Sequence, residues 1–326
     1  MKITLAHGSG GKSTNELIDK IFARHFSNPI LNMMEDSAVV KGNSKIAVTT
    51  DSFVVTPMFF KGGDIGRLAV CGTVNDLLMR GAVPKYITSA FIIEEGADTE
   101  ALEAIVKSMA LTAEEAGVIV VAGDTKVIEG NGGVYINTTG IGFVNESTDI
   151  ASTNLREGDA VIVSGTMGDH HAAILSARMN IENDIKSDNA PLGEMVRAML
   201  KAGIEIRCMR DVTRGGLGTV LNELAKASNV GIEIEEGRIP VSKSVKAFCQ
   251  ILGLNILHMG NEGKLIAVVP SEQAEEALKI IQSSKYGENA TIIGRVVHEK
   301  GVTSVTELGG KRTVNVLIGE GLPRIC

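Results

Sequence analysis

The sequence predicts a mixed α/β protein with two domains. Apolar strand-like runs alternate with helical patterns along 326 residues, which is long enough for two substantial cores. Many of the strand-like runs are short, so mixed sheets are expected in place of one doubly wound parallel sheet. A loop rich in Asn, Ser and Thr at residues 145–156 marks the expected boundary. The predicted units are a glycine-rich segment with a helix (1–34), an N-terminal domain (35–148), a C-terminal α/β domain (149–300), and a hairpin with a tail (301–326).

Hydrophobic periodicity predicts the elements of the N-terminal half. Helical patterns cover residues 15–26, 64–80 and 99–116. Strand patterns cover residues 38–41, 46–50, 53–56, 86–93, 118–122 and 134–143. Gly66 and Gly72 lie inside the second helix, where each costs about 1 kcal/mol relative to Ala. Another element is therefore expected to pack closely against that helix.

The C-terminal half continues the alternation and ends in a flexible tail. Strands are predicted at residues 159–164, 231–235, 265–269 and 290–296, and helices at 170–179, 192–202, 219–227 and 272–284. The pattern of residues 301–318 predicts a hairpin around Gly309-Gly310. In the final GEGLPRIC segment the glycines loosen the chain and the proline favours an extended neighbour. The sequence thus places Cys326 at the tip of an arm.

Composition limits the classes of partner and compartment. The formal net charge of −7 argues against nonspecific binding to nucleic acid or to anionic membranes. No apolar run reaches the roughly 18 residues of a membrane span, and the N-terminus does not read as a signal peptide. The four cysteines are scattered without a CxxC pair, which is typical of neither a zinc site nor a disulfide framework. A reducing, cytoplasmic setting is expected.

Five aspartates stand at strand ends or inside apolar helices: Asp36, Asp51, Asp76, Asp124 and Asp211. Carboxylates of this kind bind Mg²⁺, usually together with phosphate oxygens and water. Phosphoryl transfer depends mainly on such positioning and charge neutralisation. The alternative is that each Asp only caps a helix or forms a turn.

Other segments could contact phosphate or move a proton. Lys12 lies in the glycine-rich HGSGGKST segment, whose amides could line a phosphate, although its spacing differs from a Walker A loop and a plain capped loop fits equally. Arg214-Gly215-Gly216 runs into a helix and could bind an anion or simply form the helix entry. Lys126 could steady a phosphoryl group or be an exposed lysine in a turn. Glu262 is a candidate base or part of a turn before a strand.

The ordered motifs DSAVV, TTDSFVVTP, GRLAVCGTVNDLLMRGAVP, VVAGDTKV, SGTMGDHHAAIL, MRDVTRGGLG and terminal PRIC resemble the HypE family of hydrogenase maturation factors. The resemblance covers essentially the whole chain. It implies a two-domain aminoimidazole ribonucleotide synthetase-like fold, shared with selenophosphate synthetase and thiamine monophosphate kinase. It also implies an N-terminal domain that binds ATP and pairs in a homodimer.

The same resemblance implies a reaction. In this family a HypF-like carbamoyltransferase places a carbamoyl group on the terminal cysteine, which is Cys326 in this chain. The family member then uses ATP to dehydrate the S-carboxamide to a thiocyanate. The cyanide passes to iron held by a HypC–HypD-like complex and becomes a ligand of the NiFe hydrogenase centre.

The resemblance also implies roles for individual residues. Mg²⁺ would be held by Asp36, Asp51, Asp76 and Asp124. The nucleotide would contact Lys12, Asp51, Asn75, Asp76, Asp124, Thr125 and Asp211. Cys326 would carry the substrate. Two further roles are assigned from the residues themselves and not from the resemblance: Lys126 would stabilise the phosphoryl or imidate oxygen, and Glu262 would act as base. The alternatives are a small-molecule kinase or synthetase of the same superfamily, with Cys326 incidental, and a non-catalytic carrier of a modified tail.

Overall fold

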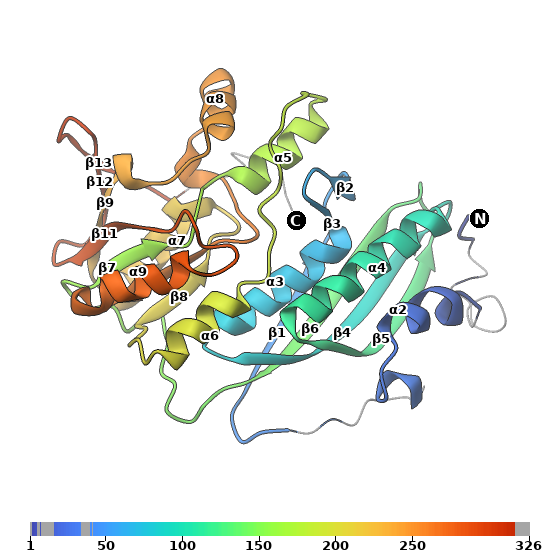
Figure 1. Ribbon diagram of the computed structural model, residues 1–326. Helices are drawn as coiled ribbons and strands as arrows, with labels where there is room; N and C mark the ends of the chain where they lie inside the picture. Colours follow the sequence, from blue (N-terminus) through green and yellow to red (C-terminus); the bar gives the residue numbers. More distant parts are fainter. Residues whose placement is uncertain (1, 5–6, 8–15, 34–39, 41, 317–326) are drawn as a thin grey trace.

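A four-stranded sheet backed by two helices forms the N-terminal unit of the computed structural model (Figure 1). The structure describes residues 2–4, 7, 16–33, 40 and 42–316, so the predictions for Lys12, Asp36, Cys326 and the flexible tail lie outside the described residues. The sheet has the order β1-β6-β4-β5, formed by Ile46–Phe53, Val134–Phe143, Val83–Glu94 and Ile119–Ile128. Helices α3 (Ile65–Met79) and α4 (Thr99–Ala116) cover one face, and the buried side chains of the strands point toward them.

Short elements surround this sheet. Chain order gives η2 (Ile18–Ala23), a π-helical turn that continues into α2 (Arg24–Phe26), then η3 (Leu31–Met33), β2 (Phe59–Phe60) and β3 (Gly63–Asp64). The first two agree with the helix predicted over residues 15–26, as far as that range is described. Phe22 of η2 packs on Phe91 of β4 with ring centroids 4.9 Å apart, which attaches the N-terminal helix to the covered face.

A seven-stranded sheet forms the C-terminal unit, with helices on both faces. Its order is β13-β12-β9-β11-β7-β10-β8, formed by Lys311–Thr313, Gly301–Val305, Gly231–Glu235, Thr291–Val297, Ala160–Val163, Leu265–Val269 and Cys208–Asp211. Helices α6 (Gly193–Lys201) and α9 (Ala274–Gln282) pack on one face and α7 (Gly216–Ser228) on the other. Helices α5 (Asp169–Arg178) and α8 (Lys243–Leu252) pack on each other at the periphery, and η4 (Glu236–Arg238), η5 (Ile256–His258) and η6 (Ser271–Gln273) complete the unit. Because helices cover both faces of this sheet, β10 is buried at every position.

The mixed α/β class is confirmed, and three local expectations are wrong. The two strands predicted at residues 46–50 and 53–56 form the single strand β1, which ends at Phe53. The helix over 99–116 and the strand over 265–269 have the predicted bounds. β5, however, continues to Ile128 because it pairs with β4 as far as Glu94, so Asp124, Thr125 and Lys126 lie in a strand and not in a turn. Residues 208–211 form the additional strand β8, which is held by pairing with β10. Within the described part of the chain, no helix is long and apolar enough to cross a membrane.

The two units share one continuous core, in which side chains of α3 and α4 join those of α6 and α9. Figure 1 shows α6 beside α3 at this junction. An extended segment, residues 182–192, crosses the junction between α5 and α6; we call it the strap. Arg67 Nε of α3 donates to both the backbone and side-chain oxygens of Asn189, each at 3.1 Å. Asn75, also on α3, donates to Ala190 O at 3.0 Å and accepts from the Leu192 N–H at 3.0 Å. These bonds fix the C-terminal unit against α3.

The close packing predicted at the two glycines of α3 is confirmed. A Cβ on Gly66 would lie 2.2 Å from the backbone oxygen of Ile105 in α4, and one on Gly72 would lie 2.9 Å from the Phe53 ring. Because Ile105 O belongs to a helix backbone, it has little freedom to move away. Gly66 therefore sets the distance between α3 and α4.

Gly66→Ala is expected to lower the free energy of unfolding by about 1–3 kcal/mol, because the added methyl group forces the two helices apart. Urea denaturation followed by circular dichroism measures the change. Gly42→Ala is the matched control, since a Cβ there meets nothing within 4 Å. Equal stability of the two variants would contradict the close-packing argument.

Candidate active site

Three carboxylates, Asp51, Asp76 and Asp211, lie near enough to influence one another's charge where α3 lies between the two sheets. Strand alternation turns Thr49, Asp51 and Phe53 toward α3, and Thr49 Oγ1 donates to Asp76 Oδ2 at 2.8 Å. β8 packs beside α3 and brings Asp211 to the same place. A cavity of about 370 Å³ opens here, and its lining includes Thr49, Asp76, Arg80, Arg210, Asp211 and Thr213. Residues from both units therefore form one site.

Crowding of like charges gives this site its electrostatic character. Burial, followed by the neighbouring carboxylates, raises the pKa of Asp211 to about 7. Burial also raises the pKa values of Asp51 and Asp76, with the charge of Asp76 adding to the effect on Asp51. Arg210 beside Asp76 and Arg214 beside Asp51 offset only part of this. A site of this kind favours a bound cation.

The donor set fits Mg²⁺. Carboxylate oxygens are the ligands this ion prefers, and it commonly takes one or two of them with phosphate oxygens and water. In the described ranges no group of three His, Cys, Asp or Glu side chains already converges as a metal site. An ion that arrives with a phosphate ligand needs only one or two protein carboxylates.

Glu262 lies in the turn before β10, only 4% exposed. Burial raises the pKa of its carboxyl well above the usual range, and the charges of Asp211 and Asp188 act in the same direction. Its backbone oxygen accepts a 3.4 Å hydrogen bond from the Asn75 amide. Glu262 is thus a buried carboxyl within electrostatic range of Asp211, Asp51 and Asp76, and positive charge bound at those carboxylates would favour its ionised form.

Asp124 and Lys126 lie elsewhere. Strand pairing places Asp124 in one row with Ala90, Asn137 and Ser52, on the sheet face away from the helices, whereas Asp51 points toward α3. Lys126 Nζ contacts Asp124 Oδ1 at 2.9 Å, and this hydrogen bond is the main cause of the lowered pKa of Asp124. The expected single cluster with Asp51 and Asp76 is therefore absent from the described part of one chain. Thr125 points to the covered face.

Asn75 has a structural role that sequence reasoning did not foresee. Its amide oxygen and nitrogen bind the backbone of the strap and of Glu262, and the residue is 2% exposed. Contact between Asn75 and a nucleotide stays a prediction. Arg214 does precede α7 as expected, and Gly216 has a φ of 65° and faces Met259 O, where a Cβ would lie 2.6 Å away.

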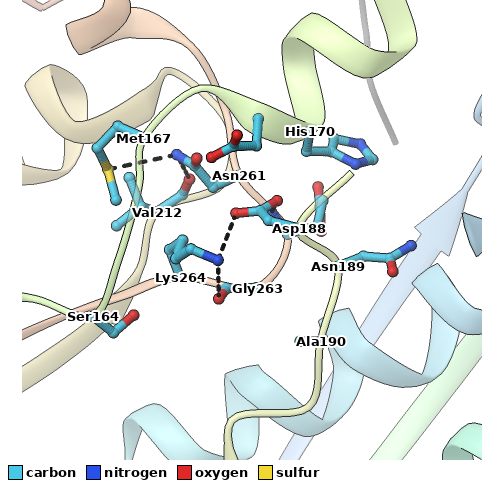
Figure 2. A network of polar contacts seen from close by, with 12 residues as sticks. Ser164, Met167, His170, Asp188, Asn189, Ala190, Val212, Asn261, Gly263 and Lys264 are labelled. Carbon is cyan, nitrogen blue, oxygen red and sulfur yellow. Dashed lines mark hydrogen bonds and ion pairs between the residues drawn. The ribbon is translucent and has the colours of Figure 1, made fainter. Parts of the chain in front are cut away.

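A buried polar network that includes Asp188, Asn261 and Lys264 was missed from the sequence (Figure 2). Lys264 Nζ lies 3.3 Å from Asp188 Oδ2 and 3.2 Å from Gly263 O. Asn261 Oδ1 accepts from the Gly168 N–H at 2.7 Å. Asp188 carries no pattern that could have singled it out, because the strap reads as an ordinary polar loop.

Comparison with known proteins gives matches over both units. The family called AIR synthase related protein matches with its N-terminal domain at residues 34–144 and with its C-terminal domain at 156–307. Carbamoyl dehydratase HypE of Azotobacter vinelandii is 48% identical over 331 residues, covering 99% of this chain and 97% of that protein. The chain belongs to the HypE family.

Solved structures of HypE proteins have the same fold. A hydrogenase maturation protein HypE crystallised in complex with ATP is 44% identical, covers 99% of both chains and superposes with a TM-score of 0.95. The HypE chain of a HypE–HypF complex is 50% identical, with a TM-score of 0.82 over 92% of this chain and 99% of that one. The two-unit architecture is therefore that of the HypE family.

Asp211→Asn is expected to stabilise the metal-free protein at pH 8, and the gain should shrink as the pH falls from about 7 to 4. The folded-state pKa is raised from 3.8 to about 7, so wild-type stability falls as the pH rises through this window. Thermal unfolding with a chelator present, from pH 4 to 8, measures the effect. The exposed Asp149 supplies the control substitution Asp149→Asn, and a pH-independent gain would contradict the charge-crowding argument.

Proposed function

We propose that this chain is an ATP-dependent carbamoyl dehydratase that converts an S-carbamoyl group on its own Cys326 into a thiocyanate. The observation that carries the proposal is the buried Glu262 beside three crowded carboxylates, Asp51, Asp76 and Asp211. This combination suits a phosphate-bound cation next to a proton acceptor. The names of the relatives and the ATP complex of one of them support the assignment.

The reaction needs both a cation bound to phosphate and a proton acceptor. The carboxamide oxygen attacks the γ-phosphorus of ATP, and the bond to ADP breaks. This oxygen then leaves carbon as inorganic phosphate while the nitrogen gives up its two protons and the C≡N bond forms. One proton stays on the phosphate and one is released. A poor leaving group is thereby replaced by a good one, and a base takes the N–H protons.

The described residues divide these tasks. Mg²⁺, held by Asp51 and Asp76 with phosphate oxygens, would supply charge neutralisation for the transferred group. Asp211 and Arg210 border the same cavity. Glu262 accepts a proton from the amide nitrogen, and its burial keeps bulk water away from that atom. Asp36, Lys12 and Cys326 lie outside the described residues, and their proposed roles rest on the family resemblance.

Lys126 and Asp124 require a second chain in this scheme. No described helix or strand covers the sheet face that carries them, which we call the uncovered face. It is partly apolar, with exposed Ile46, Val48, Ile92, Ile119 and Ile128. A homodimer formed through this face would bury those side chains and bring the Asp124–Lys126 pair into the interface. Lys126 could then stabilise the phosphoryl or imidate oxygen in a site completed by two chains. Asp124 and Thr125 would accompany it toward the nucleotide.

The further partners proposed follow from the reaction. A HypF-like carbamoyltransferase would load Cys326, consistent with the solved HypE–HypF complex of a relative. A HypC–HypD-like complex would accept the cyanide onto iron. A reducing compartment such as the cytoplasm would keep the Cys326 thiol available, and the described cysteines Cys71, Cys208 and Cys249 are all free and buried.

A small-molecule kinase or synthetase remains the rival function, because the carboxylate site alone would serve it equally. In that case Cys326→Ala would leave ATP turnover on the small molecule unchanged. A non-catalytic carrier is the third possibility, and it would tolerate loss of Asp51 without any change in ATP hydrolysis.

The full chain carbamoylated on Cys326 is expected to lose the mass of one water from its C-terminal peptide when incubated with Mg-ATP. Glu262→Gln should slow this loss by about 10²–10⁴-fold, because the proton acceptor is removed. Mass spectrometry of the peptide over time measures both. An unchanged peptide mass in the wild-type chain would refute the dehydratase proposal.

Val48→Asp is expected to convert the proposed homodimer to a monomer, since it places a charge on the 60% exposed Val48 in the uncovered sheet face. Sedimentation of the full chain measures the mass. Ile251→Asp is the matched control, because Ile251 on α8 is 82% exposed and lies on the other unit. A wild-type monomer, or two variants with the same mass, would contradict pairing through this face.

A further inference from the structure

The turn that carries Glu262 is held by the strap. The Glu262 N–H donates to Asp188 Oδ1 at 3.1 Å, and the Glu262 backbone oxygen accepts from Asn75 at 3.4 Å. A Cβ on Gly263 would lie 1.9 Å from Asp188 O, so the two backbones are in direct contact at this point. The residue next to the proposed base thus has to be glycine for the strap to reach it.

Asp188 is itself fixed from several sides. Its side chain is 5% exposed and pairs with Lys264, which is 9% exposed, at 3.3 Å (Figure 2). The backbone on either side is anchored, because the Ser187 N–H donates to Lys61 O at 2.8 Å and Arg67 binds Asn189. Ser187 Oγ also contacts His170 Nδ1 at 2.7 Å. These contacts therefore hold the Asp188 carboxylate in one position.

We propose that Asp188 is a positioning residue, whose carboxylate holds the Glu262 backbone so that the Glu262 side chain stays beside Asp51, Asp76 and Asp211. The Lys264 ammonium group lies 3.3 Å from the other carboxylate oxygen and balances its charge. The inference rests on the proposed role of Glu262 as base. A displacement of about 1 Å at a reacting group can cost a hundredfold in rate, so one hydrogen bond to its backbone has a measurable catalytic consequence.

A purely structural role of the Asp188–Lys264 pair is the competing explanation. Removing one partner of a buried ion pair destabilises a protein whatever its neighbours do. Asp188→Asn and Asp188→Ala both leave Lys264 unpaired, but only Asn keeps an oxygen that can accept from the Glu262 N–H. Comparison of these two variants separates positioning from the loss of charge.

The matched control is the second buried ion pair of the same unit. Asp159, 5% exposed, lies 3.6 Å from Arg207 Nε and accepts from the Arg156 N–H at 2.7 Å. Asp159→Ala therefore removes a buried carboxylate with the same two kinds of partner, but at the start of β7. It reproduces the stability loss and leaves the Glu262 turn intact.

The experiment is single-turnover dehydration of the carbamoylated full chain at varied Mg-ATP concentrations, with thermal unfolding measured in parallel. Asp188→Ala is expected to lower the rate at saturating ATP by about tenfold or more relative to Asp188→Asn, with the half-saturating ATP concentration unchanged. Asp159→Ala should unfold earlier than wild type and react at the wild-type rate. If Asp188→Ala does not fold, Asp188→Ala combined with Lys264→Met removes the unpaired charge and is compared with Asp188→Asn combined with Lys264→Met.

Equal rates for the Asn and Ala variants would overturn the inference, as would a loss confined to ATP affinity. Failure of the proposed function looks different, because the C-terminal peptide of the wild-type chain would then keep its full mass in the presence of Mg-ATP. The positioning role alone would be refuted by the following combination. The wild-type chain dehydrates normally, the Glu262→Gln variant does not, and the two Asp188 variants react at the same rate.

Discussion

The hydrogen bonds made by Asn75 are the constraint on which the site depends. One buried amide on α3 binds Ala190 and Leu192 of the strap and the backbone oxygen of Glu262. α3 also carries Asp76 and packs against Asp51 of β1. Because a buried amide left without partners is costly, these bonds keep the C-terminal unit in one position relative to the carboxylates. The carboxylate of Asp76 in the N-terminal unit and Glu262, the proposed base in the C-terminal unit, are thereby held close together.

The geometry that results is electrostatically unfavourable on its own. Asp51, Asp76 and Asp211 repel one another in a partly desolvated cavity, and the buried Glu262 adds to them. The folded chain bears this cost because glycines and backbone hydrogen bonds fix the surrounding elements. Gly66, Gly72 and Gly263 each allow an approach that a side chain would prevent. A site arranged in this way gains most from a ligand that brings a cation and phosphate together.

The uncovered face of the four-stranded sheet links the site to assembly. Asp124 and Lys126 belong to that face through their strand pairing. In the sequence they follow an apolar run, which is also where a turn with catalytic residues would be expected. Their separation from Asp51 within one chain makes the proposed dimer part of the chemistry. The same alternation that turns the partly buried Thr125 and Val127 toward the helices exposes their neighbours.

Much of this protein follows from local patterns in its sequence. Periodicity predicted α4 and β10 to the residue, and the interior glycines of α3 predicted a close neighbour. The type of residue also identified Asp51, Asp76, Asp211 and Glu262 as candidates for chemistry. Short-range order and side-chain chemistry are encoded within a few residues, so the sequence by itself determined them. Only the tertiary structure decided that Asp211 belongs to a strand, that Asp124 and Asp51 lie on opposite faces of a sheet, and that Asp188 holds Glu262. Those facts depend on pairing and contacts between segments far apart in the chain, which no local pattern records.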